Sequence, residues 1–341
     1  MIQIMIQIFK SVYVAVLLLV LAPMVSAQGL DKVRTFSQTN YPGFVQFVAK
    51  ELGLFKKYGI DPDLHFFPSG APIVQAAAAK EWDIAFLGAP PAVIGSSSLG
   101  LVTVGIITDN PYEHQLIGRA QYVANTLANP GALKGAKIFV TTLSTGHQMV
   151  EGCLRKFGLS SKDVAIIPSE QAATVAAFQA GQGDLAQVWS PFNDALRERG
   201  NRILCDGGQA GLHILTVWVA AKDFADKRPE LVVRWIKANG DAVKWIKEDL
   251  ARTTEMYRRF MALAGQNADG AALKGVIDAV MQMKTLEEQM GYMRAMNGAR
   301  SEADLAYQGI AEFFVRNGRM KEVPDFRPYI DASFLQRAIR R

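Results

Sequence analysis

The residues with the clearest binding chemistry are hydroxyl and glycine residues that stand directly before two predicted helices. Ser69 and Gly70 precede an Ala-rich helix, and Ser144, Thr145 and Gly146 precede a second one. A Ser or Thr at such a place can cap the helix, and the free N–H groups of the first turn, at the positive end of the helix dipole, can bind an anion. Taken alone, the second loop could be a cap that binds nothing. Because this loop is expected to lie opposite other loops of the same polarity, we favour an anion site.

The other candidate binding residues lie near the ends of predicted strands, where ligands bind in open α/β sheets. A polar loop follows a strand at 33–39, a Gly-Pro loop follows a strand at 84–87, and a strand at 213–221 is expected to cross back between two lobes. The candidates on these segments, on the Ser-Thr-Gly loop and at the end of the second copy of the strand at 84–87 are Asn40, Tyr41, Gly88, Ala89, Pro90, His147, Trp189 and Trp218.

The sequence lacks the usual patterns of catalytic and metal-binding sites. His65, His114, His147 and His213 show no metal-ligand spacing, and there is no Gly-x-Ser-x-Gly segment. The Gly-rich run at 205–211 lacks the Gly-x-Gly-x-x-Gly spacing of a dinucleotide site and is expected to be a loop. We therefore predict a protein that is not an enzyme, with no metal and no cofactor.

One stretch of the chain occurs twice and indicates how these loops are positioned. Residues 75–90 reappear 101 positions later as 176–191, so that Asp83 matches Asp184. Two copies are too few for a solenoid, which needs at least three repeats. They predict two similar α/β lobes with a binding cleft between them. Trp189 replaces Gly88 of the first copy at the exposed end of its strand, so we expect it to form a wall of the cleft.

Strands alternate with helices through both copies, and the chain becomes helical after residue 222. The further strands are expected at 64–67, 102–108, 137–142 and 201–205, and the main helices at 45–54, 146–157, 229–249, 251–263 and 302–316. The polar loop after the strand at 102–108 is expected to be the crossover between lobes, where hinge bending would occur. The predicted divisions are 28–113 for the first part of lobe 1, 114–214 for lobe 2, and 215–341 for the return to lobe 1 and the C-terminal helices.

The first 27 residues predict a cleaved signal peptide. Lys10 is their only charge, an apolar run of about ten residues follows at 12–21, and small residues end at Ala27. The run is shorter than the roughly 20 apolar residues of a membrane span. Cleavage after Ala27 would place the protein in the periplasm.

Composition argues against nucleic acid as a partner. The chain has 37 basic and 32 acidic residues, a formal charge of +5, and the two signs are interspersed. A mild positive balance favours an anionic ligand only weakly.

The two cysteines leave the redox state open. Cys153 lies on a predicted helix and Cys205 ends a predicted strand, both in the second lobe. A disulfide is geometrically possible in an exported protein, but neither residue belongs to a loop-rich framework, and buried free cysteines are common. On these grounds free thiols are the favoured state.

The combined pattern resembles the periplasmic solute-binding receptors of ABC importers for nitrate, taurine and alkanesulfonates. The resemblance extends over nearly all of 33–317. The segments that carry it are Pro68-Ser69-Gly70, Gly88-Ala89-Pro90-Pro91, Ser144-Thr145-Gly146-His147, and the block from Ala177-Phe178 to Trp189-Ser190-Pro191. The resemblance implies a two-lobed periplasmic-binding-protein fold of the venus-flytrap type (type II), with a helical C-terminal extension. It also implies closure on a small solute and delivery of that solute to an ABC permease in the inner membrane. We expect the protein to be a monomer.

The resemblance also implies a ligand class. Relatives that take sulfonates use loop hydroxyls and backbone amides, which match Ser69, Gly70, Ser144, Thr145 and Gly146 here, with no arginine in those loops. Taurine, an alkanesulfonate or a small carboxylate is therefore expected. The alternative ligands are nitrate and a thiamine pyrimidine precursor. The alternative roles are a pyrimidine-synthase-like enzyme and a receptor that serves a signalling protein. Glu113, in the crossover, could meet an amine at the far end of the ligand or could be a solvated loop carboxylate.

Overall fold

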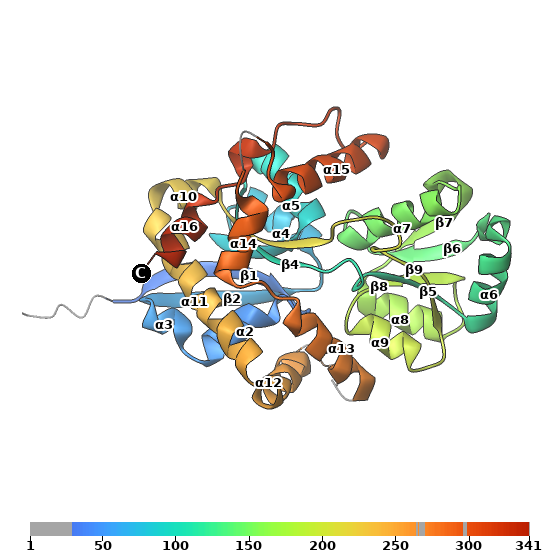
Figure 1. Cartoon of the computed structure of the whole chain (residues 1–341), viewed down its shortest axis with the longest axis horizontal. Helices are drawn as coiled ribbons and strands as arrows, with labels where there is room; N and C mark the ends of the chain where they lie inside the picture. The colour runs from blue at the N-terminus through green and yellow to red at the C-terminus, as the bar shows by residue number, and fades with distance from the viewer. Residues whose placement is uncertain (1–28, 264, 266–269, 296–298, 341) are drawn as a thin grey trace, which may run out of the picture. The chain divides into compact units, whose positions relative to one another are not determined.

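A computed structural model describes residues 29–263, 265, 270–295 and 299–340, and the elements of the fold all belong to the unit Asp31–Arg341. The predicted signal peptide and its cleavage site after Ala27 lie outside the described residues. Within the described part of the chain, the strands form two five-stranded sheets, each surrounded by helices (Figure 1). Nowhere in that part is there a helix both long enough and apolar enough to span a membrane.

The first sheet has the strand order β2-β1-β3-β10-β4. Its strands are β1 (Asp31–Gln38), β2 (Ile60–Phe67), β3 (Ile84–Gly88), β4 (Val102–Asp109) and β10 (Leu215–Ala220). β1 pairs in parallel with β2 and β3, whereas β10 runs antiparallel to β3 and β4. The parallel strands therefore end, and β10 begins, at one common edge of the sheet.

The second sheet repeats this arrangement with the order β7-β6-β8-β5-β9. Its strands are β5 (Gln115–Gly118), β6 (Lys137–Val140), β7 (Ala165–Pro168), β8 (Leu185–Val188) and β9 (Arg202–Asp206). β6 is parallel to β7 and β8, and the antiparallel strand is now β5. The two sheets have the same topology, which is what an internal duplication of the chain would produce.

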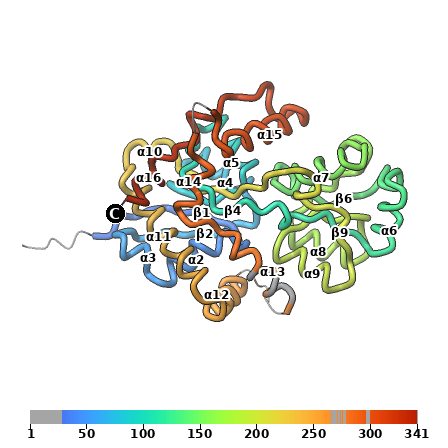
Figure 2. The backbone as a smooth tube through the Cα atoms, viewed as in Figure 1, coloured from blue at the N-terminus to red at the C-terminus, as the bar shows by residue number. Residues whose placement is uncertain are grey.

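The chain passes between the sheets twice. Residues 110–114 lead from β4 in the first sheet to β5 in the second, and residues 207–214 lead from β9 back to β10. The backbone trace shows both connections in the same region between the two sheets (Figure 2). They lie beside the divisions expected near residues 113 and 214.

Helices cover both faces of each sheet. Those before the first crossing are α2 (Phe44–Glu51), α3 (Leu54–Lys57), α4 (Gly70–Ala78) and α5 (Ala89–Leu99). Those of the second lobe are α6 (Ala120–Ala128), α7 (Thr145–Lys156), α8 (Gln171–Gln179) and α9 (Phe192–Arg197). Most of the expected helix at 45–54 is present as α2, but it ends at Glu51, and Gly53 takes up a left-handed conformation before α3 begins.

The C-terminal third is helical and returns to the first sheet, as expected. Its helices are α10 (Lys222–Lys227), α11 (Pro229–Glu248), α12 (Leu250–Leu263), α13 (Gly270–Met281), α14 (Leu286–Met293), α15 (Glu302–Arg316) and α16 (Ser333–Ile339). α11 packs against α2, α14 against β4, and α15 against α5 (Figure 1). Because both faces of the first sheet are covered, its inner strand β10 is buried along its whole length.

Equivalent aspartates show that the sequence repeat is also a structural one. Asp83, just before β3, accepts a hydrogen bond at 2.8 Å from the backbone N–H of Arg34 on β1. Asp184, just before β8, accepts one at 2.8 Å from the backbone N–H of Lys137 on β6. In both lobes the carboxylate thus holds the start of one central strand against its neighbour.

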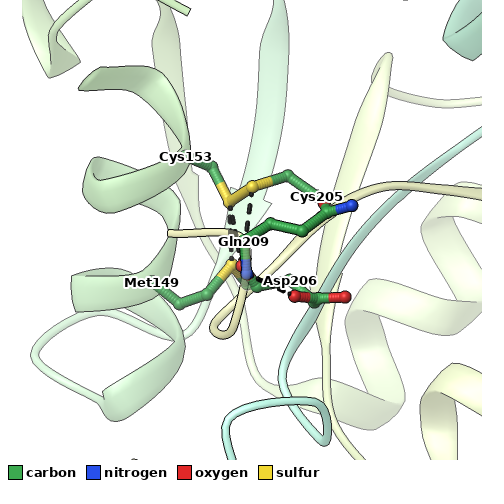
Figure 3. The surroundings of a disulfide bond; sticks show 5 residues. All are labelled: Met149, Cys153, Cys205, Asp206 and Gln209. Atoms are coloured by element: carbon green, nitrogen blue, oxygen red, sulfur yellow. Dashed lines mark hydrogen bonds between the residues drawn. A yellow bond between two sulfur atoms is a disulfide. The ribbon is translucent and has the colours of Figure 1, made fainter. Parts of the chain in front are cut away.

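The structure corrects the favoured state of the cysteines. Cys153 on α7 and Cys205 on β9 form a disulfide, with Cα atoms 6.0 Å apart (Figure 3). Both residues are fully buried in the core of the second lobe, beside Met149. The expectation of free thiols was wrong because it rested on chain context, whereas a disulfide requires only that two β-carbons meet in space.

Candidate functional site

A cavity lies where the ends of strands from both sheets meet. Its lining comes from loops that are far apart in the chain: Gln38, Asn40, Pro42, Ser69, Gly70, Phe86, Gly88, Pro91, Glu113, His114, Ser144, Thr145, Trp189 and Thr216. The described residues of this lining include no Lys or Arg. Any anion bound here would therefore be held by neutral donors.

The N-terminus of α4 forms one wall of the cavity. Ser69 occupies the N-cap position of α4 but accepts no hydrogen bond from that helix. Its hydroxyl instead donates at 3.2 Å to Oε1 of Glu170, which stands just before α8 in the other lobe. The expected cap at Ser69 is therefore absent, and the first N–H groups of α4 are left free of side-chain caps and available to a ligand.

The N-terminus of α7 faces α4 from the second lobe. The Ser144 hydroxyl caps α7, because it accepts a hydrogen bond from His147 N–H at 3.3 Å and donates to the Thr141 carbonyl at 2.6 Å. The capping expected at Ser144 or Thr145 is thus made by Ser144. Thr145, the first residue of the helix, lines the cavity.

The N-terminus of α5 completes a group of three helix ends around the cavity. Gly88 ends β3 and lines the cavity, and the prolines Pro90 and Pro91 follow within the first turn of α5. A β-carbon at Gly88 would lie 2.8 Å from Oγ1 of Thr145. A side chain at this position would therefore press against Thr145, and the glycine allows the two lobes to approach each other as they do.

Two polar side chains in the lining have atoms that no protein group satisfies. Nε2 of Gln38, at the end of β1, and Nδ1 of His114 are buried, and neither has a hydrogen-bond partner among the described residues. A buried donor without a partner costs free energy unless a ligand or water satisfies it. Burial lowers the pKa of His114 to about 3, so its ring is neutral at neutral pH. Both side chains are thus neutral groups available to a bound molecule.

Glu113 supplies the acidic group of the cavity. Its side chain is only 7% exposed, so the alternative of a solvated loop carboxylate is wrong. Burial raises the pKa of Glu113 to about 8; a hydrogen bond with Tyr41 opposes this rise, and the negative charge of Asp194 adds to it. The carboxyl is therefore mostly protonated at neutral pH when no cation is nearby. A cationic group placed beside it would favour the ionised form.

Aromatic rings close the cavity on the side of the second lobe. Trp189, which follows β8, is almost fully buried and packs against His114 with ring centroids 5.3 Å apart. Trp189 lies in the lining of the cavity. Its backbone N–H is held by Oε1 of Gln171 at 3.1 Å, so the indole is attached to a rigid polar network.

Several expected site residues lie outside the lining. Trp218 is fully buried in the core, edge to face with Trp235 at 5.3 Å. Because β10 begins at the cavity edge, Thr216 lies at that edge and lines the cavity, whereas Trp218, two residues further along, lies deeper in the sheet. Tyr41 is also fully buried, and its hydroxyl accepts a hydrogen bond from Asn110 at 3.4 Å.

The other displaced candidates belong to the first turns of helices. Ala89 and Pro90 are buried in α5, and Pro91 takes their place in the lining. Gly146 lies against the amide of Gln187, where a β-carbon would be only 2.1 Å away. His147 packs edge to face on Phe313 of α15 at 5.3 Å.

The lining residues that the sequence analysis missed are Gln38, Pro42, Phe86, Pro91, His114 and Thr216. Sequence position could have identified several of them. Pro42, Pro91 and His114 directly adjoin candidate residues, and Gln38 ends the first strand. Phe86 lies within an apolar strand, where only the fold distinguishes a cavity wall from core. Within the described ranges, no group of three or more His, Cys, Asp or Glu side chains is placed to hold a metal ion.

Comparison with known proteins places this geometry in a family. The chain is 29% identical to the taurine-binding periplasmic protein of Escherichia coli K12 over 295 residues, which are 82% of this chain and 86% of that protein.

Among solved structures, the alkanesulfonate-binding protein of Xanthomonas axonopodis pv. citri bound to MOPS matches with a TM-score of 0.73 at 19% identity, covering 89% of this chain and 99% of that one. The periplasmic nitrate-binding protein of Synechocystis PCC 6803 matches with a TM-score of 0.70 at 13% identity, covering 91% and 88%. The periplasmic-binding-protein fold expected from the sequence is thereby confirmed. Residues 39–260 match the model of the NMT1-like family, and the chain belongs to that family.

Proposed function

We propose that the protein is the extracytoplasmic receptor of an ABC importer and that it binds a small organic sulfonate, with taurine as the foremost candidate. Support comes from its relationship to a taurine-binding periplasmic protein and from the chemistry of the cavity. The proposal includes export with cleavage after Ala27, a monomeric receptor, and delivery of the solute to a permease in the inner membrane.

The observation that carries the proposal is the pairing of a neutral anion cradle with a buried acid in one cavity. The N-termini of α4, α5 and α7 and the unpaired Nε2 of Gln38 meet at the cavity and suit a sulfonate. Glu113 in the same lining suits an ammonium group. Taurine carries a sulfonate and an ammonium group two carbons apart. The sulfonate could bind at the helix N-termini and the ammonium group at Glu113.

Binding is expected to close the lobes about the two connecting segments, 110–114 and 207–214. The contact between Ser69 and Glu170 belongs to the closed form in this proposal. Small-angle scattering should show a smaller radius of gyration at saturating taurine than without it. An unchanged radius would contradict hinge closure.

A ligand panel tests the proposal directly. Taurine, ethanesulfonate, nitrate, a dicarboxylate and a neutral pyrimidine are compared by calorimetry and by thermal shift. At about 100 times its dissociation constant, a true ligand adds roughly 2.7 kcal/mol to the free energy of unfolding, or about 5 °C in Tm for a chain of this size. Stabilisation by sulfonates is expected. Stabilisation by neutral or cationic compounds alone would refute the anion cradle.

The role of Glu113 has its own test in the same panel. Because its pKa is about 8 in the empty cavity, the approach of an ammonium group should release up to one proton near pH 7. Titrations in two buffers of different ionisation enthalpy should detect this proton for taurine and not for ethanesulfonate, which lacks the amine. Equal proton release for both ligands would place the amine elsewhere.

A further inference from the structure

The hydrogen bond between Ser69 and Glu170 joins equivalent positions of the two repeats. The residues are 101 positions apart, the offset of the duplication, and each stands at the N-cap of the corresponding helix, α4 or α8. Neither side chain caps its own helix. The two side chains instead form a hydrogen bond with each other across the two lobes.

The direction of this hydrogen bond limits what Ser69 can offer a ligand. A serine hydroxyl has one proton, and here it is donated to Glu170 at 3.2 Å. The side chain of Ser69 is 1% exposed and lines the cavity. Its oxygen can therefore present only lone pairs to the cavity, and an anion must be met by the backbone N–H groups of α4.

The same contact places a carboxylate beside Ser69, the N-cap residue of α4. Glu170 is a solvent-exposed residue and does not itself line the cavity. Partial desolvation of its carboxyl raises its pKa, an effect that the hydrogen bond from Ser69 opposes. No Lys or Arg within the described residues forms an ion pair with Glu170 at 4 Å or less, so no such pair neutralises its charge.

From this arrangement we infer that Glu170, acting through Ser69, makes the anion site selective for ligands that carry a single negative charge. The inference rests on the proposed function. Repulsion between Glu170 and a bound anion grows in proportion to the charge of the anion, so a dianion such as sulfate is penalised about twice as strongly as a monoanionic sulfonate. Selectivity by an opposing charge is a known means of excluding close analogues.

Glu170 is thus a positioning residue that sets specificity without touching the ligand. Its neutral isostere provides the test. In Glu170→Gln the carboxamide oxygen can still accept the hydrogen bond from Ser69, but the negative charge is gone. The interlobe contact is preserved while the repulsion is removed.

The experiment measures the dissociation constants of ethanesulfonate and sulfate by calorimetry at one pH and one ionic strength. In the unaltered protein, ethanesulfonate should bind and sulfate should bind far more weakly. In Glu170→Gln the ratio of the two constants should fall by roughly threefold, because the interaction of a solvent-exposed charge is screened and is worth about half a decade. Glu170→Ala is a second neutral variant in case the first does not fold; it also frees the Ser69 hydroxyl to donate to either ligand, and the ratio should fall in the same direction.

Glu287→Gln is the matched control, because Glu287 is exposed on α14 and its loss changes the net charge by the same amount. The ratio should be unchanged in this variant. If the unaltered protein binds sulfonates but neither neutral variant of Glu170 changes the ratio, the charge-selectivity role is refuted and the proposed function stands. If the unaltered protein binds no sulfonate, the proposed function itself fails.

Discussion

Gly88 in the first lobe and Thr145 in the second approach so closely that a β-carbon at position 88 would lie 2.8 Å from Thr145 Oγ1. The backbone of Gly88 has φ −68° and ψ 155°, which any residue can adopt. The need for glycine here thus comes from the approach of the lobes, and a larger residue should affect closure more than folding.

Gly88→Val should weaken the binding of taurine by at least about tenfold, because the added carbons separate the lobes and remove contacts that form only on closure. Calorimetry measures the affinity, and thermal unfolding without ligand should change little. Gly309→Ala on α15 is the control, since a β-carbon there meets nothing within 4 Å. Normal affinity in Gly88→Val would show that this contact does not limit closure.

Trp189→Ala should weaken sulfonate binding by about 1 to 3 kcal/mol, the usual contribution of a lost apolar contact. The indole forms a wall of the cavity beside His114, so its removal opens the site to water. Trp245→Ala on α11 removes the same ring at a position outside the cavity lining and should leave affinity unchanged. Equal losses in both variants would point to general destabilisation instead of a binding role.

The buried Glu113 should make the ligand-free protein less stable as the pH rises. Its carboxyl has a folded pKa of about 8, against about 4.3 in an unfolded chain. The unfolded state therefore releases this proton first, and the stabilising contribution of the protonated group, complete below pH 4, is lost progressively up to pH 8.

Glu113→Gln should remove that loss, so that its advantage in the free energy of unfolding over the unaltered protein grows between pH 6.5 and 8 by about 1 to 2 kcal/mol. Chemical denaturation at several pH values measures the difference. The buried His114 has a folded pKa of about 3, against about 6.5 in an unfolded chain. Its protonation therefore affects the free energy of unfolding mainly below pH 6.5, outside the pH range of this comparison. A difference that stays constant with pH would show that Glu113 ionises normally.

Loss of the disulfide should destabilise the second lobe. Cys153 and Cys205 close a loop with a sequence separation of 52, for which the chain-entropy relation gives up to about 4 kcal/mol. The variant Cys153→Ala/Cys205→Ala should therefore unfold at lower denaturant concentration. Treatment with a reductant should destabilise the unaltered protein and leave the variant unchanged. An effect of reductant on both proteins would have another cause.

Local chain chemistry is sufficient to predict much of the fold and part of the site. The repeat at Asp83 and Asp184 predicts two similar lobes, because duplicated patterns of strand, turn and helix fold alike. Ser144 is recognisable as a cap, and Gly88 and Trp189 as residues of the cleft, because strand ends and helix starts can be identified within a few residues. Their roles in ligand binding remain predictions.

The features that distinguish this cavity depend on contacts between distant segments. Position along β10 decides that Thr216, and not Trp218, lines the cavity. The approach of the lobes decides that Ser69 donates to Glu170 instead of capping α4, and the packing of α7 on β9 brings Cys153 to Cys205. Capping and strand periodicity act over neighbouring residues and can be read along the chain. Burial, pKa and pairing depend on which residues meet in space, and only the tertiary structure decides that.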